Sequence, residues 1–150
     1  LRREEVELTL LAVDAVSDAQ AADATHEGRL DVTDDLISVT GDENRLRQVV
    51  ANLLRNAQTH TPAGTTVTLS LAREGREAVL RVADTGPGID PGIAERLFDR
   101  FARGDDSRNR DAGSTGLGLS IAQAITEAHG GTIAVDSAPG RTVFEVRLPV

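Results

Sequence analysis

Three segments of the chain carry apolar residues at helical spacing, which predicts three helices with one buried face each. In chain order these residues are Leu8, Leu11, Ala12, Ala15, Val16 and Ala19; Leu46, Val49, Val50, Leu53, Leu54 and Ala57; and Leu117, Ile121, Ala124, Ile125 and Ala128. The first helix is expected within residues 4–24. Asp42 is the predicted N-cap of the second helix, which Pro62 and Gly64 end. Gly130 and Gly131 end the third, because glycine can adopt a left-handed cap.

Alternation of apolar and polar residues predicts strands in much of the remaining chain. Two of them are joined by a short turn containing Gly75, which predicts a hairpin, and two more close the chain. Two short strands are expected after the first helix, with Asp34 and Asp35 in the turn between them. The predicted strands cover residues 30–33, 36–40, 65–73, 77–84, 132–137 and 143–148.

The segment between Gly86 and Gly113 combines glycine, proline and charges of both signs, and only residues 93–101 favour a short helix. We interpret this segment as a mobile lid with mostly solvated charges. Two of the three phenylalanines of the chain, Phe98 and Phe101, lie inside it. They indicate either local core packing or a hydrophobic anchor that holds the lid or meets another domain.

Composition limits the class of protein. With 150 residues and 39% hydrophobic content, the chain is expected to form one domain over residues 1–150. The net charge of -8 argues against a nucleic-acid partner. With no Cys and only 3 His, neither a disulfide framework nor a zinc cluster is expected. All 16 basic residues are Arg, so a P-loop, which needs a lysine, is excluded.

No apolar run approaches the roughly 18 residues of a membrane span, and no signal peptide opens the chain. We therefore expect no direct membrane contact by this domain. The chain contains no Met, which predicts a piece of a longer protein.

Asn52 and Asn56 lie one turn apart on the second helix, on the face opposite its apolar residues. Such a pair is typical of a solvated polar face. It also fits a magnesium and phosphate site, because Mg²⁺ needs only one or two protein oxygens when phosphates and water supply the others.

Asp84 ends a predicted strand and precedes Gly86 and Gly88. Asp and Gly are common in turns, which is one interpretation. In the other, the carboxylate accepts a hydrogen bond from the amino group of adenine and repels the carbonyl of guanine, which selects ATP over GTP. The two glycines would then let the backbone approach the base.

Glycines at 113, 116 and 118 do not match the dinucleotide spacing GxGxxG, and no strand directly precedes them. They predict a glycine-rich helix start. Such a start is either ordinary and flexible, or it binds phosphate through free amides and the helix dipole.

Together these motifs resemble the ATP-binding catalytic domain of bacterial sensor histidine kinases, in the superfamily shared with DNA gyrase and mismatch-repair ATPases. NLLRNAQTHTP resembles the N box of that family, DTGPGI the G1 box, FDRFAR the F box, GSTGLGLS followed by IAQAITEAHGG the G2 region, and SAPGRTVFEVRLP the last glycine box. The resemblance implies an α+β fold, a two-layer sandwich with helices on one face of a mixed, mostly antiparallel sheet, and a mobile ATP lid.

The resemblance also implies ATP and Mg²⁺ as cofactors and assigns a role to each motif residue. Asn56 would be the metal ligand, Asp84 would read the adenine, His60 would pack beside the base, and Arg103 would reach the phosphates. The implied nucleotide-binding residues are Asn52, Asn56, His60, Asp84, Gly86, Gly88, Ile89, Arg103, Gly116, Leu117, Gly118, Leu119 and Thr142. The sequence departs from the family at Thr59, where a basic residue is common, and in its last box, which is one glycine short.

Asn52 stands where ATP-hydrolysing relatives carry a glutamate that activates water, and an amide cannot accept that proton. This favours phosphoryl transfer, with Asn52 and Arg103 as the catalytic candidates. The family implies transfer to a histidine on a separate, dimerising helical domain, with a response regulator downstream, by the cytoplasmic part of a membrane-anchored kinase. An anti-sigma-type serine kinase and a non-catalytic nucleotide-binding module are the alternatives.

The three histidines are each open to a simpler interpretation. His26 is followed by Glu27, as in the acceptor motif of the family, but Gly28 comes next and no helix continues, so we expect a plain surface residue. His129 is expected to cap the end of its helix, and a helix-end cap is the alternative role for His60.

Overall fold

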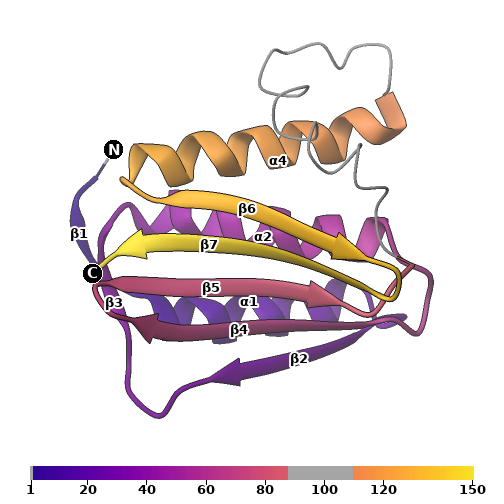
Figure 1. Ribbon diagram of the computed structural model, residues 1–150, viewed down its shortest axis with the longest axis horizontal. Coiled ribbons are helices and arrows are strands. Elements are labelled where there is room, and N and C mark those ends of the chain that lie inside the picture. The colour runs from indigo at the N-terminus through magenta and orange to yellow at the C-terminus, as the bar shows by residue number, and fades with distance from the viewer. Residues whose placement is uncertain (1, 88–109) are drawn as a thin grey trace.

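The structure is a computed structural model that describes residues 2–87 and 110–150, with side chains in the second part from residue 118 onward. The helices and strands follow one another along the chain as shown in Figure 1. They are β1 (Glu4–Glu7), α1 (Leu8–Ala22), β2 (Glu27–Val32), β3 (Ser38–Gly41), α2 (Glu43–Thr59), β4 (Thr66–Glu74), β5 (Glu77–Asp84), α4 (Arg110–Ala128), β6 (Thr132–Ala138) and β7 (Arg141–Pro149).

The large sheet has five strands in the order β2-β4-β5-β7-β6. Only the β2–β4 pair is parallel, and the other neighbours in this sheet are antiparallel. Strands β1 and β3 form a separate two-stranded sheet. Helices α1, α2 and α4 cover one face of the large sheet, and α2 contacts both α1 and α4 (Figure 1). The expected α+β two-layer fold is therefore confirmed.

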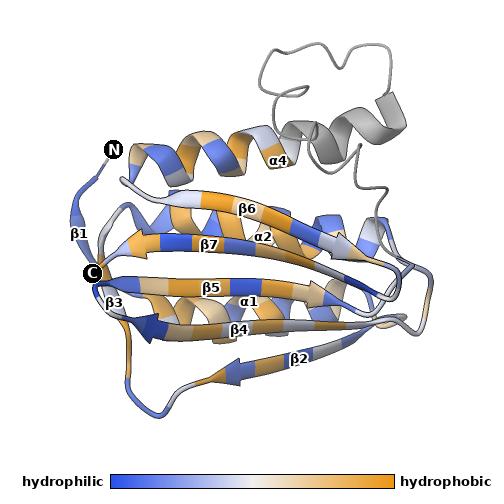
Figure 2. Ribbon diagram, in the orientation of Figure 1, coloured by the Kyte–Doolittle hydropathy of each residue, from blue (hydrophilic) through white to orange (hydrophobic). Residues whose placement is uncertain are grey.

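The core lies between the sheet and the helices. Apolar side chains alternate along β4, β5 and β7, so that every second residue faces the helices (Figure 2). Leu53 of α2 and Leu69 of β4 are fully buried, and Phe144 of β7 is 1% exposed. Burial of each such side chain contributes about 1.5–3 kcal/mol, so this interface holds the helices on the sheet.

Several predicted elements are confirmed. The second predicted helix is α2, and the side chain of Asp42 caps it by accepting a hydrogen bond from the Arg45 amide at 3.2 Å. The predicted hairpin is β4–β5, and the closing strands are β6 and β7. At the end of α4, Gly130 has φ +76, which is the predicted left-handed cap.

The N-terminal third differs from the prediction. Residues 4–7 were expected within the first helix but form β1, because Val6 is buried opposite Val39 of β3 and the helix begins only at Leu8. The two short strands predicted after α1 also belong to different sheets. Strand β2 pairs with β4 and β3 pairs with β1, and Asp34 and Asp35 lie in the connection between β2 and β3.

No helix formed by residues 2–87 and 110–150 is both long and apolar enough to cross a membrane.

Candidate functional site

Helix α4 packs against α2 on the face that carries Asn52. The side-chain nitrogen of Asn52 donates a hydrogen bond to the carbonyl oxygen of Gly118 in α4, at 3.1 Å. One turn later Asn56 is 4% exposed, and its Oδ1 atom has no hydrogen-bond partner among the described residues. The interpretation of this face as a solvated surface is therefore wrong for Asn56.

Helix α4 begins at Arg110, whereas the sequence predicts a helix start in the glycine-rich segment. Gly116, Leu117, Gly118 and Leu119 therefore lie within the helix in this structure, where backbone amides bond to the carbonyl four residues earlier. The cost of glycine in a helix, about 1 kcal/mol per residue, is offset by packing of the later turns on α2, where Leu119 is 1% exposed. Whether these amides contact phosphate stays a prediction.

Asp84 lies at the end of β5 and is 6% exposed. Burial raises the pKa of its carboxyl above the ordinary value, although the Gly86 amide, which donates to Oδ1 at 2.9 Å, and the charge of His60 act in the opposite direction. A carboxylate kept out of water with one backbone donor retains acceptor capacity for a ligand.

Thr142 lies directly across from Asp84, because the two residues are partners in the register of β5 and β7. It is 3% exposed, and its hydroxyl group lies 2.8 Å from that of Ser137. The structure thus brings together two residues that are 58 positions apart in the sequence and that the family resemblance assigns to the nucleotide site.

Position 86 requires glycine because Thr61 lies too close to leave room for a side chain. A Cβ atom on this residue would lie 2.6 Å from Cγ2 of Thr61, the second residue after α2. Thr61 was not among the predicted site residues, although it directly follows His60 in the N box. His60 itself is exposed, and its backbone amide donates to the Asn56 carbonyl at 3.1 Å, so it forms the C-cap of α2.

Other predicted site residues lie outside the described part of the chain. They are Gly88, Ile89 and Arg103, together with Phe98, Phe101 and the lid they belong to. These assignments stay predictions.

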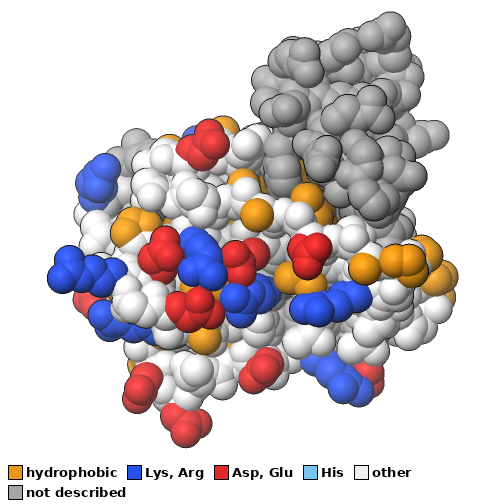
Figure 3. All heavy atoms as spheres, viewed as in Figure 1, with side chains coloured by type: hydrophobic (Ala, Val, Ile, Leu, Met, Phe, Trp, Pro, Cys, Tyr) orange, Lys and Arg blue, Asp and Glu red, His pale blue; other side chains and the backbone are white. Residues whose placement is uncertain are grey.

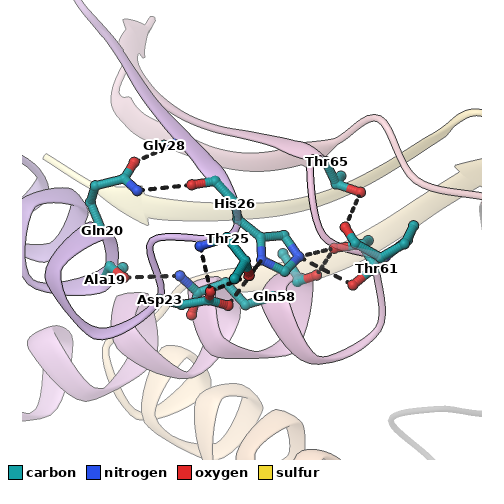
Figure 4. A network of polar contacts seen from close by, with 11 residues as sticks. Ala19, Gln20, Asp23, Thr25, His26, Gly28, Gln58, Thr61 and Thr65 are labelled. Carbon is teal, nitrogen blue, oxygen red and sulfur yellow. Dashed lines mark hydrogen bonds and ion pairs between the residues drawn. The ribbon is translucent and has the colours of Figure 1, made fainter.

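The other two histidines are engaged in hydrogen bonds. His129 follows α4, and its Nδ1 lies 2.8 Å from the Ile125 carbonyl, as expected of a helix cap. Its Nε2 also accepts from the Asp42 amide at 3.0 Å and so links the end of α4 to the start of α2. His26 was expected on the surface but is only 6% exposed, because it lies in a polar network between α1 and α2 (Figure 4).

The described residues contain no group of three or more His, Cys, Asp and Glu side chains that could hold a metal ion. The feature that fits a metal is the unpartnered Oδ1 of Asn56, because an amide oxygen is a hard ligand of the kind Mg²⁺ accepts.

Known proteins resemble the chain over its whole length. The probable sensor histidine kinase TcrY of Mycobacterium tuberculosis is 52% identical over 150 residues, which are 100% of this chain and 32% of TcrY. The chain therefore spans about a third of the length of the curated relatives it matches.

Among solved structures, the mycobacterial sensor histidine kinase MprB is 30% identical with a TM-score of 0.81, over 98% of this chain and 97% of that one. The ATP binding domain of PrrB from Mycobacterium tuberculosis is 26% identical with a TM-score of 0.79, over 99% and 98% of the two chains. The model of the family described as histidine kinase-, DNA gyrase B-, and HSP90-like ATPase matches residues 41–150. The chain belongs to this family.

Proposed function

We propose that this chain is the catalytic domain of a sensor histidine kinase, which binds Mg-ATP and transfers the γ-phosphoryl group to a histidine on a separate helical domain. The observation that carries the proposal is the buried Oδ1 of Asn56, which lacks a partner among the described residues. A buried polar atom without a partner costs about 1–3 kcal/mol, a cost that a ligand or cation would remove. The likeness to TcrY, MprB and PrrB supports the same assignment.

The adenine would bind at the end of β5. The Asp84 carboxylate would accept from its amino group, and Thr142 would lie beside the same edge of the base, since the two residues are paired across the strands. His60 would pack beside the ring, and Gly86, Gly88 and Ile89 would allow the backbone to approach it.

The phosphates would lie between α2 and α4. Asn56 would supply one oxygen to Mg²⁺, which when bound would neutralise charge on the phosphate oxygens. The amides of residues 116–119 and the guanidinium of Arg103 would contact the phosphates. Because α4 holds those amides in helical turns here, nucleotide binding would require the first turns of the helix to unwind.

Asn52 favours transfer over hydrolysis. Its amide nitrogen is already used as a donor to Gly118, and an amide has no basic site with which to activate water. The phosphoryl group would therefore pass to a protein acceptor. His26 and His129 use both ring nitrogens in contacts within the domain, so neither presents a free nitrogen as that acceptor.

Binding is tested by isothermal titration of the domain with ADP and ATP, with and without Mg²⁺. We expect magnesium-dependent binding that Asp84→Asn weakens by at least about a hundredfold, as loss of a charged hydrogen-bond acceptor in a buried site implies. Glu145→Gln on the outer face of the sheet serves as the matched control and should bind normally. Unchanged affinity in Asp84→Asn would overturn the assignment of the pocket.

Transfer is tested with the parent protein or with its helical domain supplied in trans. Labelled ATP should give a phosphoprotein that is labile in acid, as a phosphohistidine is. An acid-stable product would indicate a serine kinase, and binding without transfer would indicate a non-catalytic module. The same phosphoprotein can be used to test the proposed transfer to a response regulator. Membrane anchoring of the parent protein is a separate part of the proposal.

A further inference from the structure

A buried polar network lies at the C-terminal ends of α1 and α2 and is centred on His26 (Figure 4). None of the motif residues assigned to the nucleotide belongs to it. It nevertheless ends at Thr61, whose methyl group packs against Gly86 in the base-binding part of the site.

The ring of His26 faces hydrogen-bond acceptors on both sides. Its Nδ1 lies 2.9 Å from a carboxylate oxygen of Asp23, and its Nε2 lies 3.1 Å from the carbonyl oxygen and 2.8 Å from the hydroxyl oxygen of Thr61. The Thr61 hydroxyl donates to the Ala57 carbonyl at 2.6 Å, which leaves its lone pairs for the ring. The carbonyl oxygen of Thr61 only accepts, so the contact at Nε2 requires the proton to be on that nitrogen. Nδ1 also lies 3.2 Å from the hydroxyl oxygen of Thr25.

The contact between His26 and Asp23 is partly shielded from water. The His26 side chain is 5% exposed and that of Asp23 is 27% exposed. Hydrogen bonds from the hydroxyl and the amide of Thr25, and then the charge of His26, lower the pKa of Asp23. The residues of α1, α2 and β4 that line the small cavity beside the ring are uncharged, among them Val16 and Leu54. Asp23 is therefore the charged group that faces the imidazole from the elements packed around it.

The contacts continue from the ring to the adenine-reading carboxylate. His26 holds the backbone and the side chain of Thr61, Thr61 packs on Gly86, and the Gly86 amide donates to Asp84 at 2.9 Å. A shift of Thr61 would change the position of Gly86, because the two residues are in direct contact and the glycine has no side chain that could adapt. The orientation of the Asp84 carboxylate depends on that amide.

We propose that His26 is a positioning residue for the nucleotide base, which through its Nε2 donor fixes Thr61 against Gly86 and so orients the Asp84 carboxylate. The proposal rests on the proposed nucleotide site. Loss of the Nε2 donor would loosen Thr61 and lower nucleotide affinity.

Two variants of nearly equal size separate positioning from packing. The amide nitrogen of glutamine falls close to the place of Nε2 in histidine, whereas that of asparagine falls close to the place of Nδ1. His26→Gln therefore keeps the donor to Thr61, and His26→Asn keeps only the donor to Asp23. We expect His26→Asn to weaken binding of Mg-ADP by about threefold to tenfold and His26→Gln to stay within about twofold of the wild type, as loss of one hydrogen bond implies.

The melting temperature of each variant is measured alongside. If both variants bind as tightly as the wild type, or if both lose affinity equally with an equal loss of melting temperature, the role of His26 is only structural and the proposal is overturned. The split between the two variants with similar melting temperatures supports it.

A second measurement does not depend on nucleotide. In the ligand-free protein, the amide resonance of Gly86 should move in His26→Asn and stay close to its wild-type position in His26→Gln. If the wild type failed to bind nucleotide, the proposed function would fail while this difference still supported the link from His26 to Gly86. A Gly86 resonance that is unchanged in His26→Asn overturns the link.

Discussion

Charged side chains have opposite environments on the outer face of the sheet and at the end of β5. On the outer face, charges of both signs are interleaved over the strands (Figure 3). Arg81 and Arg147 form ion pairs with Glu74, Glu77 and Glu145 at 2.7–3.3 Å. Partial burial acts to raise the pKa of Glu145, but hydrogen bonds from the two arginines outweigh it and leave that pKa below its usual value. Hydrogen bonds to Glu145, which contributes most, and to Glu77 and Glu74 raise the pKa of Arg147.

At the end of β5 the polar groups are buried and lack such partners. Burial raises the pKa of Asp84, and the Asn56 oxygen has no partner among the described residues. Exposed ion pairs contribute little to stability and tolerate change. Buried, under-satisfied groups cost stability, so their presence at one end of the sheet indicates that they serve a ligand.

The largest expected effect on the ligand-free protein is that of Asp84→Asn. The amide keeps the acceptor for the Gly86 N–H and removes a charge that burial penalises, so the free energy of unfolding should rise by about 1 kcal/mol at neutral pH. Urea denaturation measures it. A variant that binds no nucleotide but is more stable would show that the site costs stability, and a clear loss of stability would contradict the contrast between the two regions.

The parts of this contrast that could be predicted from the sequence are those set by local pattern. The apolar spacing of α2 and its N-cap at Asp42 are properties of adjacent turns, and the β4–β5 hairpin follows from alternation around Gly75. The family resemblance implies that Asp84 and Thr142 both belong to the nucleotide site, and the register of β5 and β7 places the two residues side by side.

What could not be predicted depends on partners far away in the sequence. The polar face of α2 is typical of a solvated helix, but α4 packs against α2 and Asn56 is buried. Strand β1 has a single apolar residue, Val6, so its pairing with β3 has no local pattern. His26 was expected on the surface because its partner Thr61 is 35 residues away.

The carboxylates of Asp84 and Glu145 should make the stability of the folded protein depend on pH in opposite directions. The raised pKa of Asp84 means that the folded state binds its proton more tightly, so its ionisation destabilises the protein as pH rises through that pKa. The lowered pKa of Glu145 has the opposite sign: its contribution is present at neutral pH and is lost as pH falls through the folded pKa. Measured against the wild type, Asp84→Asn should be more stable and Glu145→Gln less stable at pH 7.

Both differences should shrink as the pH is lowered, because the protonated carboxyl resembles the amide. Chemical denaturation at a series of pH values gives the two curves. Differences of the same sign at neutral pH would mean that the two carboxylates do not experience opposite environments.

The smallest expected effect is that of Glu145→Gln on both stability and binding. The charge is partly exposed, and Arg81 and Arg147 keep other acidic partners in Glu74 and Glu77 after the substitution. The change in unfolding free energy should therefore be smaller than that of Asp84→Asn, and it should decrease further at high salt, which screens exposed pairs. Calorimetric titration with Mg-ADP should give wild-type affinity, since these side chains lie on the face of the sheet opposite the helices. A loss of affinity that salt abolishes would show instead that the outer face acts on the site through the strands, and the two regions would then no longer be independent.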